Sequence, residues 1–160
     1  MHTRIQQMDL VEISVDGRPA QALGTLSEFV MTACTQTAAH YTKVGFSPPW
    51  ISFLAMCDSQ AVGICAFIAA PTGGRVEIAH HTFPPFEGRG AATAMVRELI
   101  ARAEHSDPQV ELFAHTLAEP NASNAILRKL GFEFVSQRCH PEEGEIWEWR
   151  HRTTKARDLS

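Results

Sequence analysis

Short apolar runs alternate with turn residues through the middle of the chain, and this pattern predicts antiparallel strands. Two apolar runs, 50–57 and 61–69, flank the polar segment Asp58-Ser59-Gln60, which predicts a β-hairpin. A third apolar run, 75–83, follows the turn Pro71-Thr72-Gly73-Gly74. Together the three runs predict an antiparallel meander.

Three other segments carry apolar residues three and four positions apart, the spacing of a helix with one buried face. The first covers 26–41, and the second runs from Ala92 to a stop near Ser106-Asp107-Pro108. The third begins around Asn121, because Asn and Ser side chains accept hydrogen bonds from the free amides of a first turn. It ends at Gly131, which suits a left-handed cap.

Four further apolar runs predict strands at 8–15, 110–117, 132–135 and 146–149. With 160 residues and 17.7 kDa, the chain has the size of one hydrophobic core, so we assign residues 1–151 to a single domain. Residues 152–160 have little apolar surface to bury, and we expect them to form a disordered tail.

The composition excludes several classes of function. A formal charge of −4 and a pI of about 6.0 leave no basic surplus for a phosphate backbone, so we expect no nucleic-acid partner. The four cysteines form no Cys-x-x-Cys pair, which favours reduced thiols over a zinc site or a disulfide framework. The polar N-terminus and the absence of an apolar run of ~20 residues predict no secretory leader and no membrane span, so we expect a cytoplasmic location.

The loop Glu87-Gly88-Arg89-Gly90 lies between a predicted strand and a predicted helix, an order that favours anion binding. Glycines let the backbone approach an anion closely, and a helix N-terminus adds unpaired amides and the positive end of the dipole. A plain tight turn is the alternative that so short a pattern leaves open. The loop lacks the signatures of a P-loop and of a dinucleotide site, so a phosphate-bearing ligand other than a nucleoside triphosphate or NAD is favoured.

Two motifs make the chain resemble the GNAT N-acetyltransferase superfamily. In that family a strand ends in a Val-x-Pro-like segment and Gln/Arg-x-x-Gly-x-Gly/Ala opens a helix; here residues 82–93 read TFPPFEGRGAAT. Further along, the family shows an Asn and a Ser before a helix that ends in Lys-x-Gly-Phe, and residues 121–132 read NASNAILRKLGF. Residues 76–79 and the closing strands are similar to the branch that contains ribosomal-protein N-terminal acetyltransferases. The resemblance covers residues 50–150 and implies an α+β fold with a central mixed, mostly antiparallel sheet flanked by helices.

By this resemblance the chain is an acetyltransferase that uses acetyl-CoA as the acyl donor. Backbone groups of the loop and the next helix would hold the pyrophosphate, the strand end would pair with the pantetheine, and the second motif would contact the arm from the opposite strand. The residues implied are Thr82, Phe83, Gly88, Arg89, Gly90, Ala91, Ala92, Thr93, Asn121 and Ser123. Glu87 departs from the family, which usually has Gln or Arg there, and we expect its side chain to point to solvent.

Acyl transfer needs a base to remove a proton from the amine and can use an acid for the departing thiolate. Glu77 is the leading base, acting directly or through water; the alternative is a structural hydrogen-bond partner. His80, His81 and His115 lie near the same sheet centre, and an ordinary pKa of ~6.5 suits proton relay. Because adjacent strand residues face opposite ways, only one of His80 and His81 should face the cofactor. No metal site is expected, since no carboxylate or thiol stands at ligand spacing beside them.

The tyrosine that the family usually employs as the acid is missing, because the only tyrosine of this chain is Tyr41. Ser123 can substitute through its hydroxyl, or the thiolate can leave unaided and take a proton from water. Aromatic residues that line an acceptor pocket, or alternatively belong to the core, are Tyr41, Phe46, Trp50 and Trp147.

Three hypotheses arise for the function. The first is an N-acetyltransferase for a peptide N-terminus or a small amine. The second is a catalytically inactive acetyl-CoA-binding sensor or interaction module, which Glu87 and the missing tyrosine favour. The third is an unrelated α+β domain with a fortuitous loop. A homodimer is compatible with the GNAT class, and the sequence does not identify the acceptor.

Overall fold

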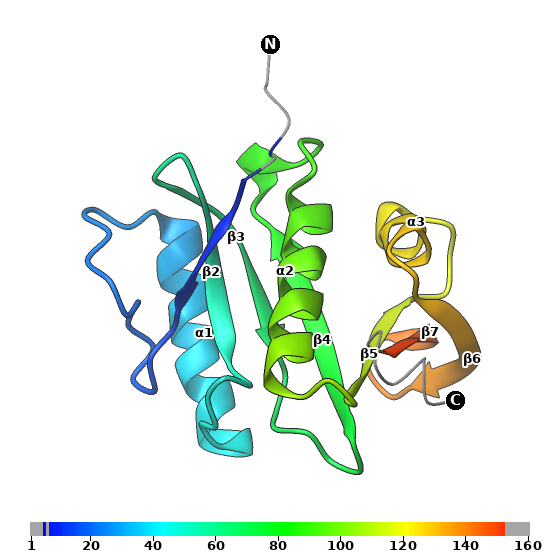
Figure 1. The fold of residues 1–160 in the computed structure, drawn as a ribbon. Coiled ribbons are helices and arrows are strands. Elements are labelled where there is room, and N and C mark those ends of the chain that lie inside the picture. Colours follow the sequence, from blue (N-terminus) through cyan, green and yellow to red (C-terminus); the bar gives the residue numbers. More distant parts are fainter. Residues whose placement is uncertain (1–4, 6, 153–160) are drawn as a thin grey trace.

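The computed structural model describes residue 5 and residues 7–152. This part of the chain folds into one sheet of seven strands with three α-helices (Figure 1). The strands are β1 (Asp9–Glu12), β2 (Ser52–Cys57), β3 (Gln60–Phe67), β4 (Arg75–Thr82), β5 (Glu111–Leu117), β6 (Glu133–His140) and β7 (Gly144–Arg152). The helices are α1 (Glu28–Val44), α2 (Ala91–Ser106) and α3 (Ala122–Lys129), and a short 3₁₀ helix, η1 (Pro84–Phe86), precedes α2.

The strands follow the order β1-β2-β3-β4-β5-β7-β6, and every neighbouring pair is antiparallel except β4 and β5. The predicted meander is therefore confirmed in β2, β3 and β4. At the β2–β3 turn, Asp58 (φ 50°) and Ser59 (φ 66°) both have positive φ, the geometry that matches the twist of a two-residue hairpin. The expected α+β fold with a mixed, mostly antiparallel sheet is also confirmed.

Helices α1 and α2 cover opposite faces of the β2–β4 part of the sheet. Two successive residues of β3, which point to opposite faces, show this. Gly63 of β3 faces α2, since an added Cβ would lie 3.1 Å from the methyl group of Met95. The next residue, Ile64, lines a cavity beside α1. In Figure 1, α2 lies in front of the sheet and α1 behind it. Fully buried apolar side chains fill both layers, for example Phe53 and Leu99 on the α2 side and Leu54 and Val30 on the α1 side.

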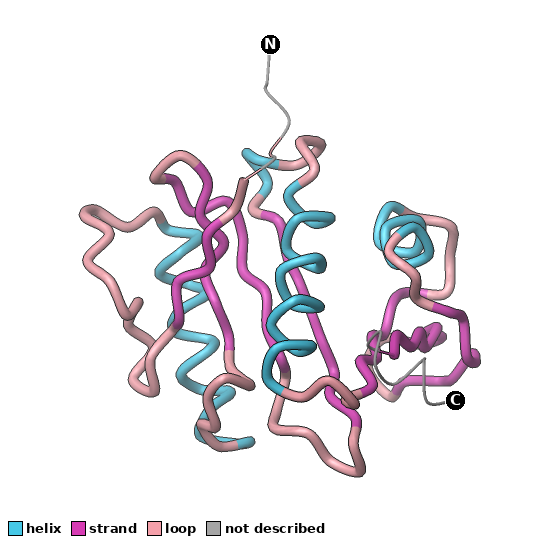
Figure 2. The backbone as a smooth tube through the Cα atoms, viewed as in Figure 1, coloured by secondary structure: helices cyan, strands magenta, loops and turns pink. Residues whose placement is uncertain are grey.

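Strands β4 and β5 run parallel but pair only from Arg75↔Glu111 to Glu77↔Phe113. In the described sheet, β4 residues beyond Glu77 pair with β3, and β5 residues beyond Phe113 pair with β7. The sheet therefore opens between β4 and β5, and β5, β6, β7 and α3 lie apart from the first four strands (Figures 1 and 2). Backbone edges left unpaired in this way can bind an extended ligand.

Element ends differ from the predicted ones for local reasons. Helix α1 begins after Ser27, whose hydroxyl accepts a hydrogen bond from the Val30 amide at 3.3 Å, and it continues past residue 41 to Val44. Strand β6 continues to His140 because it pairs with β7 along its length. Arg152, expected in the tail, still pairs with Glu111 in the sheet. The remaining residues of the expected tail, 153–160, lie outside the described residues. Among the described residues, every helix is too short or too polar to cross a membrane.

Candidate active site

A cleft of about 580 Å³ lies between the end of β4, the start of α2 and helix α3. Its lining includes seven of the residues that the resemblance assigns to the cofactor: Thr82, Gly88, Gly90, Ala91, Ala92, Thr93 and Ser123. His80, His81, Glu87 and Lys129 also border this cleft. The fold thus brings the two sequence motifs together at one place. We call this space the cofactor cleft.

The N-terminus of α2 has a geometry that suits an anion. Gly88 (φ 78°) and Gly90 (φ 85°) adopt a left-handed backbone that residues with side chains rarely enter. Gly90 is the N-cap, so no side chain caps the first-turn amides, and Ala91 and Ala92 of that turn line the cleft. Uncapped amides and the positive end of the helix dipole fit a diphosphate. The Glu87 side chain is exposed, as expected, at the rim.

Arg89 does not line the cofactor cleft, although it belongs to the predicted loop. Its guanidinium lies over the Phe86 ring, 5.5 Å from the centroid, and its carbonyl accepts a hydrogen bond from the Ile5 amide at 2.7 Å. The residue therefore holds the loop against neighbouring segments.

Helix α3 is fixed by two asparagines. The side chain of Asn121 accepts a hydrogen bond from the Asn124 amide at 2.9 Å, which confirms the predicted cap. Asn124 is 5% exposed; its side chain accepts hydrogen bonds from the Thr116 hydroxyl and from the Trp149 indole N–H, the latter at 3.1 Å. These contacts tie α3 to β5 and β7. They place Ser123 where it lines both the cofactor cleft and the gap between β4 and β5.

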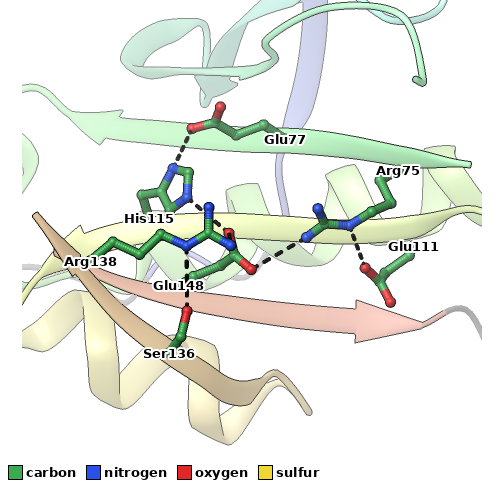
Figure 3. A network of polar contacts seen from close by, with 7 residues as sticks. All are labelled: Arg75, Glu77, Glu111, His115, Ser136, Arg138 and Glu148. Carbon is green, nitrogen blue, oxygen red and sulfur yellow. Dashed lines mark hydrogen bonds and ion pairs between the residues drawn. The ribbon is translucent and has the colours of Figure 1, made fainter. Parts of the chain in front are cut away.

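A network of charged side chains crosses the sheet where β4 and β5 diverge (Figure 3). Glu77 Oε2 lies 3.3 Å from His115 Nδ1, and His115 Nε2 lies 3.3 Å from Glu148 Oε1. Glu148 also contacts Arg138 Nη2 at 3.4 Å and Arg75 Nη2 at 3.5 Å. Because these residues come from β4, β5, β6 and β7, the network joins the two halves of the sheet.

Glu148 is the buried centre of this network, with a side chain 4% exposed. A buried carboxylate is tolerated when cations and hydrogen bonds surround it. Arg75 is itself held by Glu111, at 2.6 Å. Both ring nitrogens of His115 face carboxylate oxygens, and both can donate only when the ring carries two protons. With one proton, the ring donates to one carboxylate and can accept a proton on the other side, so the Glu77–His115 contact suits proton transfer.

Strand alternation predicted that only one of His80 and His81 would face the cofactor, but both line the cofactor cleft, because β4 has no paired strand on its β5 side here and the cleft reaches both of its faces. His80 is half-buried and lines the cofactor cleft and the β4–β5 gap. Its burial, reinforced by the neighbouring His81, lowers its pKa below 6.5. His81 is exposed and lines both the cofactor cleft and a cavity beside α1. Glu77 lies on the α1 face too, since it is four strand positions from His81.

The cavity beside α1 measures about 590 Å³, and we call it the α1 cavity. Its larger apolar side chains are Phe29, Ile64, Ile68 and Phe83. Phe83 was expected to pair with the pantetheine, but its amide already donates to the Val62 carbonyl at 2.9 Å. The Phe83 ring stacks on Phe29 at 5.8 Å between centroids, so this residue belongs to the α1 cavity.

Tyr41 serves the core. Its hydroxyl donates to the Ile13 carbonyl at 2.8 Å and accepts from the Ser52 amide at 3.0 Å. None of the four aromatics considered for the acceptor pocket, namely Tyr41, Phe46, Trp50 and Trp147, lines the α1 cavity.

Burial raises the pKa of the Cys65 thiol to about 12, which disfavours it as a nucleophile. No group of three or more metal-binding side chains is arranged for an ion within residues 5 and 7–152.

Glu148 and Lys129 were not predicted from the sequence. Glu148 stands between Trp147 and Trp149, so strand alternation places its side chain on the opposite face of the strand from both rings. Nothing in the sequence indicates that other side chains bury this face. Lys129 belongs to the Lys-x-Gly-Phe motif at the end of the helix that carries Ser123. Its position in that motif was a usable signal for a cation beside the cofactor cleft.

Fold and site together define a class: an α+β domain whose sheet opens between two parallel strands, with an uncapped helix N-terminus at the opening. The sequence model of a family described as "Acetyltransferase (GNAT) domain" matches residues 12–133. The chain belongs to the GNAT acetyltransferase family. The resemblance seen in the two motifs is therefore confirmed, and the hypothesis of an unrelated domain with a fortuitous loop is wrong.

Several solved structures share this fold. RimL, a ribosomal L7/L12 α-N-protein acetyltransferase in complex with coenzyme A, has a TM-score of 0.64 and 16% identity over 82% of this chain and 75% of that chain. The microcin C7 self-immunity acetyltransferase MccE, in complex with acetyl-CoA and AMP, has a TM-score of 0.62 and 13% identity over 77% and 69%. A chimera of the spermidine N-acetyltransferase SpeG, from Vibrio cholerae and hSSAT, has a TM-score of 0.71 and 12% identity over 96% and 99%. The comparison with curated proteins gives no match.

Proposed function

We propose that this protein is an N-acetyltransferase that moves the acetyl group of acetyl-CoA directly to a primary amine, a peptide N-terminus or a small amine. The observation that carries the proposal is that two separate family motifs line one cleft, with uncapped α2 amides at its end. CoA has matching parts, a diphosphate and an extended arm with amides, and the open edge of β4 suits that arm. The CoA and acetyl-CoA complexes of RimL and MccE support this choice of donor.

The proposed reaction uses groups on both faces of the open sheet. The amine nitrogen forms a bond to the acetyl carbon, the C–S bond breaks, and its electron pair goes to sulfur. The amine proton goes to Glu77 through water, because Glu77 lines neither the cofactor cleft nor the α1 cavity, and the His115 contact stabilises the carboxyl group in either protonation state. His81, which borders both spaces, is the second candidate base. The Ser123 hydroxyl hydrogen-bonds the leaving thiolate, which then takes a proton from water.

Lys129 and the first turn of α2 are the groups that would hold the phosphates of the donor. Lys129 supplies a positive charge beside the amides, and Asn121 fixes the helix that carries it. In this proposal the predicted residues of the loop act through their backbone. The cytoplasmic location and the homodimer stay predictions.

A thiol-release assay with acetyl-CoA and a panel of primary amines tests the proposal. We expect turnover with at least one amine, and we expect Glu77→Gln to lower kcat by about 100-fold, the usual contribution of a positioned base. Glu133→Gln is the matched control because Glu133 is 75% exposed and lies outside the cofactor cleft. Equal kcat in the two variants would contradict the role of Glu77.

An inactive acetyl-CoA-binding module is the second candidate. It is favoured by one observation: the chain's only tyrosine is committed to the core and cannot serve as the acid. Binding of acetyl-CoA without release of thiol for any amine would support this module and reject the enzyme.

A further inference from the structure

The α1 cavity meets the cofactor cleft at one residue. His81 lines both spaces, so a molecule in the α1 cavity can present a nitrogen toward the β4 edge where the thioester arm is proposed to lie. The α1 cavity, about 590 Å³, falls in the size range of small-molecule pockets. An assignment of the acceptor to this cavity rests on the proposed function, because it concerns the same reaction.

The charges of the α1 cavity disfavour an acceptor with several ammonium groups. Glu28, in the first turn of α1, is the one carboxylate among its described lining residues. The two titratable bases, His40 and His81, add positive charge when protonated. A polyamine placed here would leave most of its ammonium groups without an anionic partner, which is unfavourable in a partly desolvated space.

The apolar side chains of the α1 cavity favour an acceptor with an apolar body. Phe29 is 43% exposed, and it stacks on Phe83 with an interplanar angle of 20°. Ile64 and Ile68 complete this wall from β3 and the segment after it. An aromatic ring in the α1 cavity would cover the exposed face of Phe29, and aromatic pairs of this kind are favourable.

We propose that the acceptor is a monoamine with an aromatic or other apolar body, which lies along the Phe29–Phe83 wall and directs its nitrogen toward His81. A small arylalkylamine therefore fits better than a polyamine. The α1 cavity sets this preference through Phe29, and the reacting groups on β4 are shared by all amines.

Steady-state acetyl transfer at saturating acetyl-CoA, with 2-phenylethylamine and spermine as the two probes, tests the inference. We expect kcat/KM to be at least about tenfold higher for 2-phenylethylamine, because half-burying an aromatic ring changes binding by about this factor. Phe29→Ala should raise KM for 2-phenylethylamine by about tenfold and change kcat by less than about twofold, because the lost contact lies away from the reacting atoms.

Met31→Ala is the matched control. Met31 lies on the same helix and is 50% exposed, but it does not line the α1 cavity, so its removal should leave both constants unchanged. Melting temperatures of both variants show whether they remain folded. A higher kcat/KM for spermine, or equal KM values in the Phe29 and Met31 variants, overturns the inference and leaves the transferase function standing.

Failure of the proposed function gives a different result, namely no thiol release with any amine. In that case the melting shift produced by 2-phenylethylamine decides the inference separately. A shift that Phe29→Ala abolishes and Met31→Ala retains supports the assignment of the α1 cavity. No shift in the unaltered protein overturns it.

Discussion

Replacement of Glu148 by Gln tests whether the charged network holds the two halves of the sheet together. The carboxylate is 4% exposed and has two cationic neighbours, Arg138 and Arg75, at 3.4 and 3.5 Å, and the His115 ring at 3.3 Å. Removing one partner of a buried ionic group costs about 3–5 kcal/mol. Arg75 keeps its 2.6 Å contact with Glu111, and Arg138 is 57% exposed and can turn to water. We therefore expect the lower end, about 3 kcal/mol.

Urea denaturation followed by circular dichroism measures the change in the free energy of unfolding, and a thermal scan measures the change in Tm. For a chain of 160 residues, a loss of about 3 kcal/mol corresponds to a fall in Tm of about 6–12 °C. Glu133→Gln is the control, because it removes the ion pair between Glu133, 75% exposed, and Arg150 at 3.7 Å. An exposed pair of this kind contributes less than about 1 kcal/mol. If Glu148→Gln is no more destabilising than Glu133→Gln, the network does not join the sheet as described.

Three further outcomes are expected. Lys129→Ala should raise the calorimetric Kd for CoA by about tenfold, because one charge-assisted phosphate contact is lost; an unchanged Kd would remove Lys129 from the site. Ser123→Ala should lower kcat by about tenfold through loss of one hydrogen bond to the leaving sulfur, with an unchanged Kd for acetyl-CoA; an unchanged kcat would exclude that bond. The pKa of His80 is below 6.5 in the folded chain, so the free energy of unfolding should fall as the pH drops from 6.5 through the folded pKa, because the unfolded chain then binds more protons. His80→Gln should flatten that part of the urea-measured stability curve, and an unaltered slope would contradict it.

The sequence was sufficient to predict most elements, because their signals are local. The periodic apolar positions and the caps at Asn121 and Gly131 depend on residues a few positions apart. Strand alternation gives His80 and His81 different second cavities, but it did not predict that both line the cofactor cleft at the open edge of β4. The glycine loop before α2 was predictable for the same reason as the caps, since the glycines and the following helix are contiguous in the chain, and its role in phosphate binding stays a prediction.

The rest of the site depends on pairings between distant strands. Glu148 becomes buried because β7 lies between β5 and β6, an order that local patterns do not specify. Phe83 was expected to contact the cofactor, but its amide pairs with Val62 and its ring stacks on Phe29 of α1. The structural role of Asn124 could not be predicted either, because its hydrogen-bond partners Thr116 and Trp149 lie on β5 and β7, far from it in the sequence.

The proposed function depends above all on the first turn of α2, which is proposed to hold the diphosphate of the donor. Titration calorimetry with acetyl-CoA on the unaltered protein, Ala92→Asp and Ala101→Asp tests this role. Ala92 is in the first turn and lines the cofactor cleft, whereas Ala101 is exposed further along the same helix. An acidic side chain in a first turn favours the helix itself, so lost binding would not reflect lost folding.

A carboxylate about 5 Å from a phosphate is repelled by about 3 kcal/mol at an effective dielectric constant of about 20, which is about 100-fold in Kd. We predict that the unaltered protein and Ala101→Asp bind acetyl-CoA alike and that Ala92→Asp binds about 100-fold more weakly. Equal affinity in all three proteins, or no binding to the unaltered protein, would contradict a diphosphate site at the first turn of α2.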